Sequence, residues 1–160
     1  MRFVYLRPVL SDLSQGARIS FVRQFRFMTQ DELSSKLGLT GENKRRSICR
    51  YETGERNPKE ERVKKIAKIL NVNFNAIKKY DYKSNEDIIY TLMWLEELLP
   101  NLHVDLIKNK ILSNKELENL ENGINKWMKM KSKRDLRQIT YKEYINWKLN
   151  FDLEENIWQN

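Results

Sequence analysis

Apolar residues recur at intervals of three and four along most of this chain, which is the spacing of one face of an α-helix. After Pro58 the apolar stripe consists of Val63, Ile66, Ala67 and Leu70. Comparable stripes mark helices over 14–26, 29–37, a segment ending at Tyr51, a short segment after Asn73, 86–99, a segment from Ser113 and a segment from Thr140. Met1–Leu13 is either a short strand or an arm packed on the body. The pattern therefore predicts an all-α chain.

Helical spacing also predicts which face of each helix is buried. In the first helix the inward residues are Ile19, Val22 and Phe25, and the outward residues are Arg18, Arg23 and Arg26. In the helix over 86–99 the inward stripe is Ile88, Leu92, Leu95 and Leu99, widened by Ile89 and Met93. In the last two helices the inward residues are Leu117, Leu120, Ile124 and Trp127, followed by Tyr144, Ile145, Trp147 and Lys148.

Several helix ends are marked by residues that satisfy free backbone groups. Thr29 can accept a hydrogen bond from a first-turn amide, and Gly38 can take the left-handed conformation that ends a helix. Gly54 ends the next helix, and Asn57-Pro58 marks a turn. Two later helices open with capping-box patterns, Ser113-x-x-Glu116 and Thr140-x-x-Glu143. The stretch from Thr29 to Pro58 is therefore two short helices around a glycine turn, the second crowded with arginine.

Two short helices joined in this way form the helix-turn-helix that reads the DNA major groove. From about Gly16 to Tyr82 the chain resembles the Cro/repressor-type (XRE-like) helix-turn-helix regulators, at Gln30, Leu33, Leu37, Gly38, Leu39, Ile48, Tyr51, Glu52, Gly54, Asn57 and Pro58. The resemblance implies a five-helix, repressor-like DNA-binding domain from a bacterium, a phage or a mobile element.

The turn departs from the family pattern. About four extra residues lie between Leu39 and Ile48, and four residues turn an α-helix through roughly one turn. Either they lengthen the reading helix at its N-terminal end, with Thr40 as the cap, or they widen the turn around Gly41, with Asn43 as the cap.

Positive charge is concentrated in the first half of the chain. Residues 1–83 hold 19 Lys and Arg against 9 Asp and Glu, a net charge of +10, whereas residues 84–160 hold 11 against 13, a net charge of −2. This split indicates that only the first half meets a polyanion. It predicts a basic DNA-binding domain over 1–83 and a small helical C-terminal domain over 84–160, for dimerisation or partner binding.

The resemblance implies which side chains touch DNA. Aligned on the buried Ile48, the groove-facing residues are Arg45, Arg46 and Arg50. An arginine fork can donate to guanine O6 and N7 together, which is the commonest specific base contact. Lys44 and Asn43 are further candidates for base contact. The candidates for phosphate contact are Thr29, Gln30, Arg56, Asn57 and Lys59.

The sequence lacks the residues that a structural zinc site or a catalytic triad requires. One cysteine, Cys49, and one histidine, His103, are too few for a structural zinc site or a catalytic triad. We therefore expect no catalytic residue, no metal and no cofactor. We also expect no signal peptide and no membrane span, and a cytoplasmic, nucleoid-associated location. The aromatic residues of the second half are assigned to its core and to a dimer seam: Trp94, Trp127, Tyr141, Tyr144, Trp147 and Phe151.

These features predict a transcriptional regulator, with repression as its mode, that binds a palindromic operator in double-stranded DNA as a homodimer. Two strongly basic domains repel each other, so residues 84–160 are expected to join the two copies. The alternative is a phage or mobile-element inhibitor, anti-CRISPR-like or otherwise anti-defence, whose helical half binds a protein partner. Selection of a short palindrome from random DNA would distinguish the two.

Overall fold

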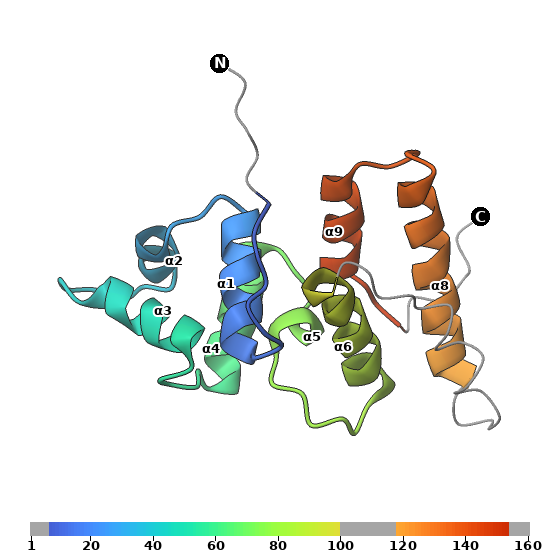
Figure 1. The fold of residues 1–160 in the computed structure, drawn as a ribbon. Coiled ribbons are helices and arrows are strands. Elements are labelled where there is room, and N and C mark those ends of the chain that lie inside the picture. The colour runs from blue at the N-terminus through green and yellow to red at the C-terminus, as the bar shows by residue number, and fades with distance from the viewer. Residues whose placement is uncertain (1–6, 100–117, 154–160) are drawn as a thin grey trace, which may run out of the picture. The chain divides into compact units, whose positions relative to one another are not determined.

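The computed structural model describes residues 7–99 and 118–153 of the 160-residue chain (Figure 1). The helices are α1 (Gln15–Phe25), α2 (Gln30–Lys36), α3 (Lys44–Thr53), α4 (Glu60–Leu70), α5 (Phe74–Ile77), α6 (Asn85–Leu98), α8 (Glu118–Asp135) and α9 (Tyr141–Leu149). No strand occurs in these two ranges, so the predicted all-α fold class is confirmed. None of the helices described there is long and apolar enough to cross a bilayer.

Some of the sequence predictions fall on other residues. The capping box at Ser113, Leu117 and His103 lie outside the described ranges. Of the stretch Met1–Leu13, residues 7–13 are described; they form no strand, and Leu10 is 5% exposed. This part of the stretch is therefore a packed arm.

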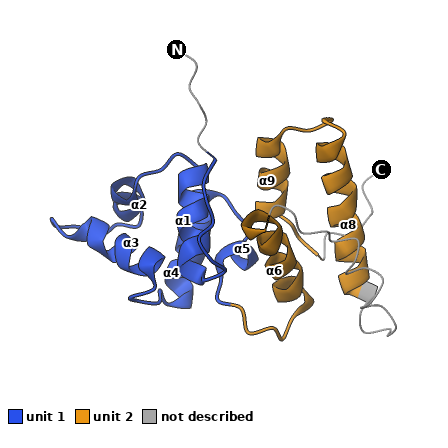
Figure 2. Ribbon diagram, viewed as in Figure 1, with its two compact units in different colours: residues 1–79 blue, residues 80–160 orange. Residues whose placement is uncertain are grey.

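The chain divides into two compact units, residues 1–79 and residues 80–160 (Figure 2). The first unit contains α1 to α5, and the second contains α6, α8 and α9. The division falls between Lys79 and Tyr80, just before the polar stretch that starts at Asp81.

The first unit is a bundle of five short helices. The predicted stripe of α4 is buried, with exposed fractions of 3% or less at Val63, Ile66, Ala67 and Leu70. Thr29 caps α2 as predicted: its hydroxyl accepts from the backbone N–H of Glu32 at 3.1 Å, and its own N–H donates to the Glu32 carboxylate at 2.6 Å. Gly38 and Gly54 take the left-handed conformation, with φ of 74° and 79°. The local signals in this half of the sequence thus set the helix ends.

The prediction that the arginines of α1 point outward is wrong. Arg18 is 2% exposed, and its guanidinium donates to three backbone carbonyls, those of Leu13, Ala76 and Lys78. Arg26 donates to two carbonyls at the end of α4, those of Leu70 and Asn71. The last carbonyls of a helix have no partner within it, and a guanidinium supplies several donors in a fixed fork. These arginines therefore tie helices together.

The helices α1 and α3 approach each other closely at Gly16. A Cβ atom at this position would contact the carbonyl oxygen of Tyr51 and lie 2.5 Å from that of Glu52. Both oxygens belong to the backbone of α3 and cannot swing aside as a side chain could. The crossing therefore requires glycine at this position.

The second unit has an aromatic core that also contains ionic groups. The indole N–H of Trp127 donates to the Tyr144 hydroxyl at 2.8 Å, and that hydroxyl donates to the Glu96 carboxylate at 2.6 Å. Lys148 donates to the same carboxylate at 2.9 Å. Burial, reinforced by the negative charge of Glu96, raises the pKa of Tyr144. The hydroxyl therefore stays neutral and donates its proton to the hydrogen bond that links α9 to α6.

The predicted inner stripe of α6 is only partly right. Ile89 and Met93 are buried, but three of the four central residues, Ile88, Leu92 and Leu95, are half-buried, and the fourth, Leu99, is exposed. Tyr90 and Trp94 are buried in their place, and the Tyr90 hydroxyl donates to the carbonyl of Phe151 at 2.6 Å. Because the apolar residues of α6 lie on two overlapping faces, its periodicity could not choose between them. The buried face is the one that carries the large rings of Tyr90 and Trp94, where the Tyr90 hydroxyl also finds a buried hydrogen-bond partner.

Candidate nucleic-acid interface

The turn between α2 and α3 is wide. Since α2 ends at Lys36 and α3 begins at Lys44, the extra residues of this sequence lie in the turn. The alternative in which Thr40 caps a longer reading helix is therefore wrong. Asn43 holds the N-cap position, as the other alternative predicts, but its side chain makes no cap hydrogen bond. Gly41 lets the wide turn pass through a φ of 88°.

One side of α3 is buried and the other is exposed. Ile48, which was predicted to be buried, and Tyr51 are 0% and 7% exposed and hold the helix against the rest of the first unit. Arg45, Arg46 and Arg50 are all exposed. Arg46 precedes Ile48 by two residues, so the two side chains point about 160° apart around the helix. The structure thus brings the three arginines predicted to read bases to the exposed side of α3.

A row of hydrogen bonds runs from α1 to the first turn of α3. Arg23 of α1 donates to both carboxylate oxygens of Glu52, at 2.6 and 3.0 Å. Glu52 also accepts from the Gln30 side-chain N–H₂ at 2.8 Å, and the Gln30 side-chain oxygen accepts from Arg45 at 3.2 Å. A carboxylate can only accept and a guanidinium can only donate, so these two neighbours fix the orientation of the Gln30 amide. The row therefore positions both Gln30 and Arg45.

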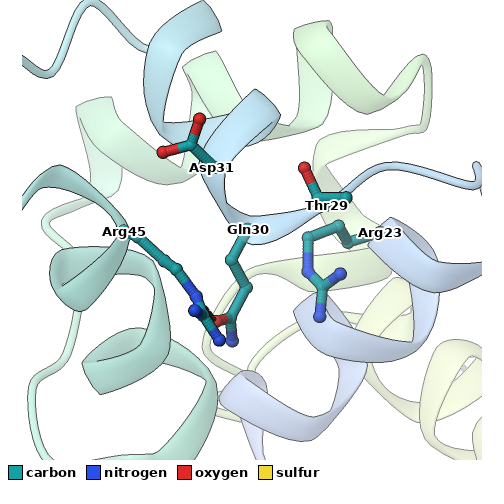
Figure 3. Close-up of a pocket in the computed structure, with 5 residues that line it drawn as sticks. All are labelled: Arg23, Thr29, Gln30, Asp31 and Arg45. Carbon is teal, nitrogen blue, oxygen red and sulfur yellow. Dashed lines mark hydrogen bonds between the residues drawn. The ribbon is translucent and has the colours of Figure 1, made fainter.

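An open pocket of about 560 Å³ lies beside this row, lined by Arg23, Thr29, Gln30, Asp31 and Arg45. Figure 3 shows the side chains of Gln30 and Arg45 extending toward each other and meeting at their tips. Glu52 neutralises Arg23, and both side chains are shielded, at 6% and 11% exposure. Arg45 is therefore the cationic group that this pocket offers to an anionic oxygen.

The remaining candidates for base contact differ in their partners. Lys44 is held against α2, with its ammonium 2.7 Å from the Ser35 hydroxyl and 3.4 Å from the Asp31 carboxylate. Arg50 lies 3.6 Å from the Glu55 carboxylate, in an exposed pair of the kind that contributes little. The side chain of Arg46 has no hydrogen-bond or ion-pair partner in the part of the chain that the structure describes. Arg46 is thus the arginine most available to a ligand.

The candidates for phosphate contact lie on both sides of α3. Thr29 and Gln30 stand at the start of α2, where the Thr29 hydroxyl also donates to the Glu32 carboxylate at 2.8 Å. The Thr29 backbone N–H, with that hydroxyl, lowers the pKa of Glu32. The other three candidates are exposed in the segment between α3 and α4: Arg56, Asn57 and Lys59.

Three residues of this site are missing from the sequence prediction: Arg23, Asp31 and Glu52. Glu52 matches the family pattern and follows the buried Tyr51, so its position carried a signal. Arg23 was assigned to the outer face of its helix, because periodicity does not show that α3 covers that face. No local pattern links Asp31 to Lys44.

The geometry agrees with a comparison against known families. Residues 16–80 match the model of a family described as helix-turn-helix domain. Comparison with curated proteins and with solved structures gives no match. The match runs from the second residue of α1 to beyond α5, and its bounds lie within two residues of those of the resemblance to Cro/repressor-type regulators. Residues 16–80 of this chain are therefore similar to a helix-turn-helix domain, which suggests a DNA-binding regulator.

Proposed function

We propose that the protein is a sequence-specific transcriptional regulator that reads duplex DNA in the major groove with α3. The observation that carries this proposal is the exposed arginine face of α3 opposite the buried Ile48, with Arg45 held in place by Gln30. A side chain that is held before binding loses less conformational entropy when it binds.

The three arginines have different parts in this proposal. Arg46 makes a bidentate contact with a guanine, because nothing in the described structure competes for its guanidinium. Arg45 contacts the neighbouring base or its phosphate from a position set by Gln30. Arg50 exchanges its weak pairing with Glu55 for a base contact. The attachment of Lys44 to α2 favours a role in closing the wide turn over base reading.

Phosphate contacts orient α3 in the groove. Thr29 and Gln30 supply them on one side, and Arg56, Asn57 and Lys59 supply them on the other. The internal bonds of Arg18, Arg23 and Arg26 mean that part of the +10 charge of the first half stabilises the fold. The exposed cations of α3 and of the segment between α3 and α4 provide the contact with DNA.

The protein would regulate transcription as a dimer. One helix-turn-helix reads only a few base pairs, so two copies about 34 Å apart, one turn of DNA, would read a palindromic operator. Residues 80–160 would join the copies, and occupancy of the operator would repress transcription in the cytoplasm, at the nucleoid. The protein acts by binding, without catalysis.

Selection from a random DNA library tests the proposal. The full-length protein should enrich one short palindrome. Arg46→Ala should lose preference at one base of each half-site and weaken the best site by about 1–3 kcal/mol. Lys65→Ala, at an exposed position of α4, is the matched control and should leave the preference unchanged. If no sequence is enriched, the proposal of a sequence-specific regulator is wrong, and the alternative of an inhibitor that binds a protein partner is favoured.

A further inference from the structure

The second unit has its own concentration of positive charge. Residues 84–99 contain four acidic residues and no basic one, whereas residues 126–137 contain six basic residues and one acidic residue. The near-neutral total of residues 84–160 is thus an average over segments of opposite charge. The expectation that only the first half meets a polyanion rests on that average.

Two of these cations are neutralised inside the unit. The Lys131 ammonium lies 3.3 Å from the Asp135 carboxylate and 4.0 Å from that of Glu96. The Arg134 guanidinium lies 2.8 Å from Asp135 and 3.5 Å from Glu96, and it sits over the ring of Tyr144. These contacts join α8 to α6 and α9, so Lys131 and Arg134 serve the fold.

Lys129, Lys133 and Arg137 form a separate group, which we name the basic stripe. Lys129 and Lys133 are four residues apart on one side of α8, and Arg137 follows two residues after the helix ends at Asp135. All three are exposed, and none of their side chains has a hydrogen-bond or ion-pair partner among residues 7–99 and 118–153. The positions three and four residues from Lys129 hold Asn125, Lys126, Ser132 and Lys133, so no carboxylate is placed to neutralise it along the helix.

The fold gains little from the basic stripe. Like charges four residues apart, such as Lys129 and Lys133, destabilise a helix. The helix macrodipole favours a cation in the last turn, and this accounts for Lys133. It does not account for Lys129, which lies more than one turn before the end of α8 at Asp135. Arg137 takes a left-handed conformation, with φ of 57°, at a position where glycine or asparagine is usual. The charge of the stripe is therefore better explained by a ligand than by the fold.

We propose that the basic stripe binds the phosphate backbone of duplex DNA, so that both units of the chain contact the nucleic acid. This inference rests on the proposed function, because the duplex read by α3 supplies the phosphates that the stripe would bind. Lysine is depleted at protein–protein interfaces, whose centres are apolar and aromatic, whereas lysine and arginine are the residues that neutralise DNA phosphates. An acidic protein surface is thus the less suitable occupant.

The test compares salt dependence in full-length proteins. The variant Lys129→Gln/Lys133→Gln/Arg137→Gln removes the charge, and Lys129→Arg/Lys133→Arg/Arg137→Lys keeps it at the same positions. Fluorescence anisotropy with a selected operator and with a random duplex, each long enough to extend beyond the operator, gives log K against log salt. Each lost phosphate contact should make the slope shallower by about 0.9, hence by roughly 2–3 per subunit for the stripe.

The expected result has three parts. The uncharged variant has a shallower slope on both duplexes, its ratio of operator to random affinity is unchanged, and the charge-keeping variant behaves as wild type. An unchanged slope in the uncharged variant overturns this inference but does not contradict the proposed recognition of DNA by the helix-turn-helix. If that variant instead loses binding to poly-glutamate with its DNA slope unchanged, the stripe binds an acidic polypeptide, and the inference is again overturned. A wild-type protein that binds neither duplex overturns both proposals.

Discussion

Substitution of Glu52 by glutamine tests whether the row of hydrogen bonds holds the reading helix in place. The Glu52 carboxylate accepts two bonds from Arg23 and one from Gln30, and its side chain is 6% exposed. A glutamine amide has the same shape but no charge, and its N–H₂ group faces donors instead of supplying an acceptor. Glu52→Gln therefore leaves a shielded guanidinium without a counter-charge.

The expected loss follows from these contacts. Breaking a buried ion pair by removing one partner costs about 3–5 kcal/mol. Arg23 keeps its bond to the Met28 carbonyl at 2.7 Å and is 11% exposed, and the new amide oxygen still accepts one bond. We therefore expect Glu52→Gln to lower the free energy of unfolding of the first unit by about 2–3 kcal/mol, the size of one or two lost charge-assisted bonds. Glu55→Gln, at an exposed position, should change it by less than about 0.5 kcal/mol.

The distribution of tryptophan makes the assay specific to one unit. The four tryptophans lie at positions 94, 127, 147 and 158, all in the second unit. Urea unfolding followed by tryptophan fluorescence therefore reports on the second unit, while far-ultraviolet circular dichroism reports on the helices of both. Glu52→Gln should shift the part of the dichroism transition that belongs to the first unit and leave the fluorescence transition unchanged.

A double substitution provides the sharper control. Replacing Arg23 by methionine and Glu52 by leucine removes both charges, so no buried charge is left unpaired. This variant should be more stable than Glu52→Gln. If Glu52→Gln unfolds within about 0.5 kcal/mol of wild type, the ion pair does not stabilise the unit as a buried pair should. Our account of how Gln30 and Arg45 are positioned would then be wrong.

Three further outcomes are expected. Gly16→Ala should destabilise the first unit by about 1–3 kcal/mol, because its Cβ meets backbone oxygens of α3. Gly123→Ala, whose Cβ comes nearest to side-chain atoms of Ile89 and Leu153, should cost less in the same urea titration, because side chains can move where backbone cannot. The pKa of Glu32 in the folded protein lies below its ordinary value of 4.5, so the stabilisation by the Thr29 cap is complete above pH 4.5 and is lost as the pH falls through the folded-state pKa. Stability measured against pH should therefore drop more in wild type than in Glu32→Gln, and equal curves would contradict this account. Finally, sedimentation should show a dimer for the full chain at micromolar concentration and a monomer for residues 1–83, whereas a monomeric full chain would exclude dimerisation through the second unit.

The sequence by itself determined the features that depend on near neighbours. Thr29, Gly38, Gly54 and the Thr140 capping box each act through backbone groups within a few residues, so the helix ends could be read from short patterns. The stripe of α4 was equally clear, because one face is apolar and the other is charged. The candidate base-reading arginines came from the family pattern around Ile48, and the structure places all three on the exposed side of α3.

Only the tertiary structure decided which charged groups are internal. Arg18 meets the end of α5, some sixty residues along the chain, and Arg23 meets Glu52 on another helix. Nothing in the local spacing distinguishes these arginines from Arg46, which has no such partner in the described structure. The same holds for Lys131 and Lys129 on α8, one paired inward and one exposed. Spacing along a helix fixes the direction of a side chain, but the helix packed against that side decides whether its charge is neutralised in the fold or exposed to a ligand.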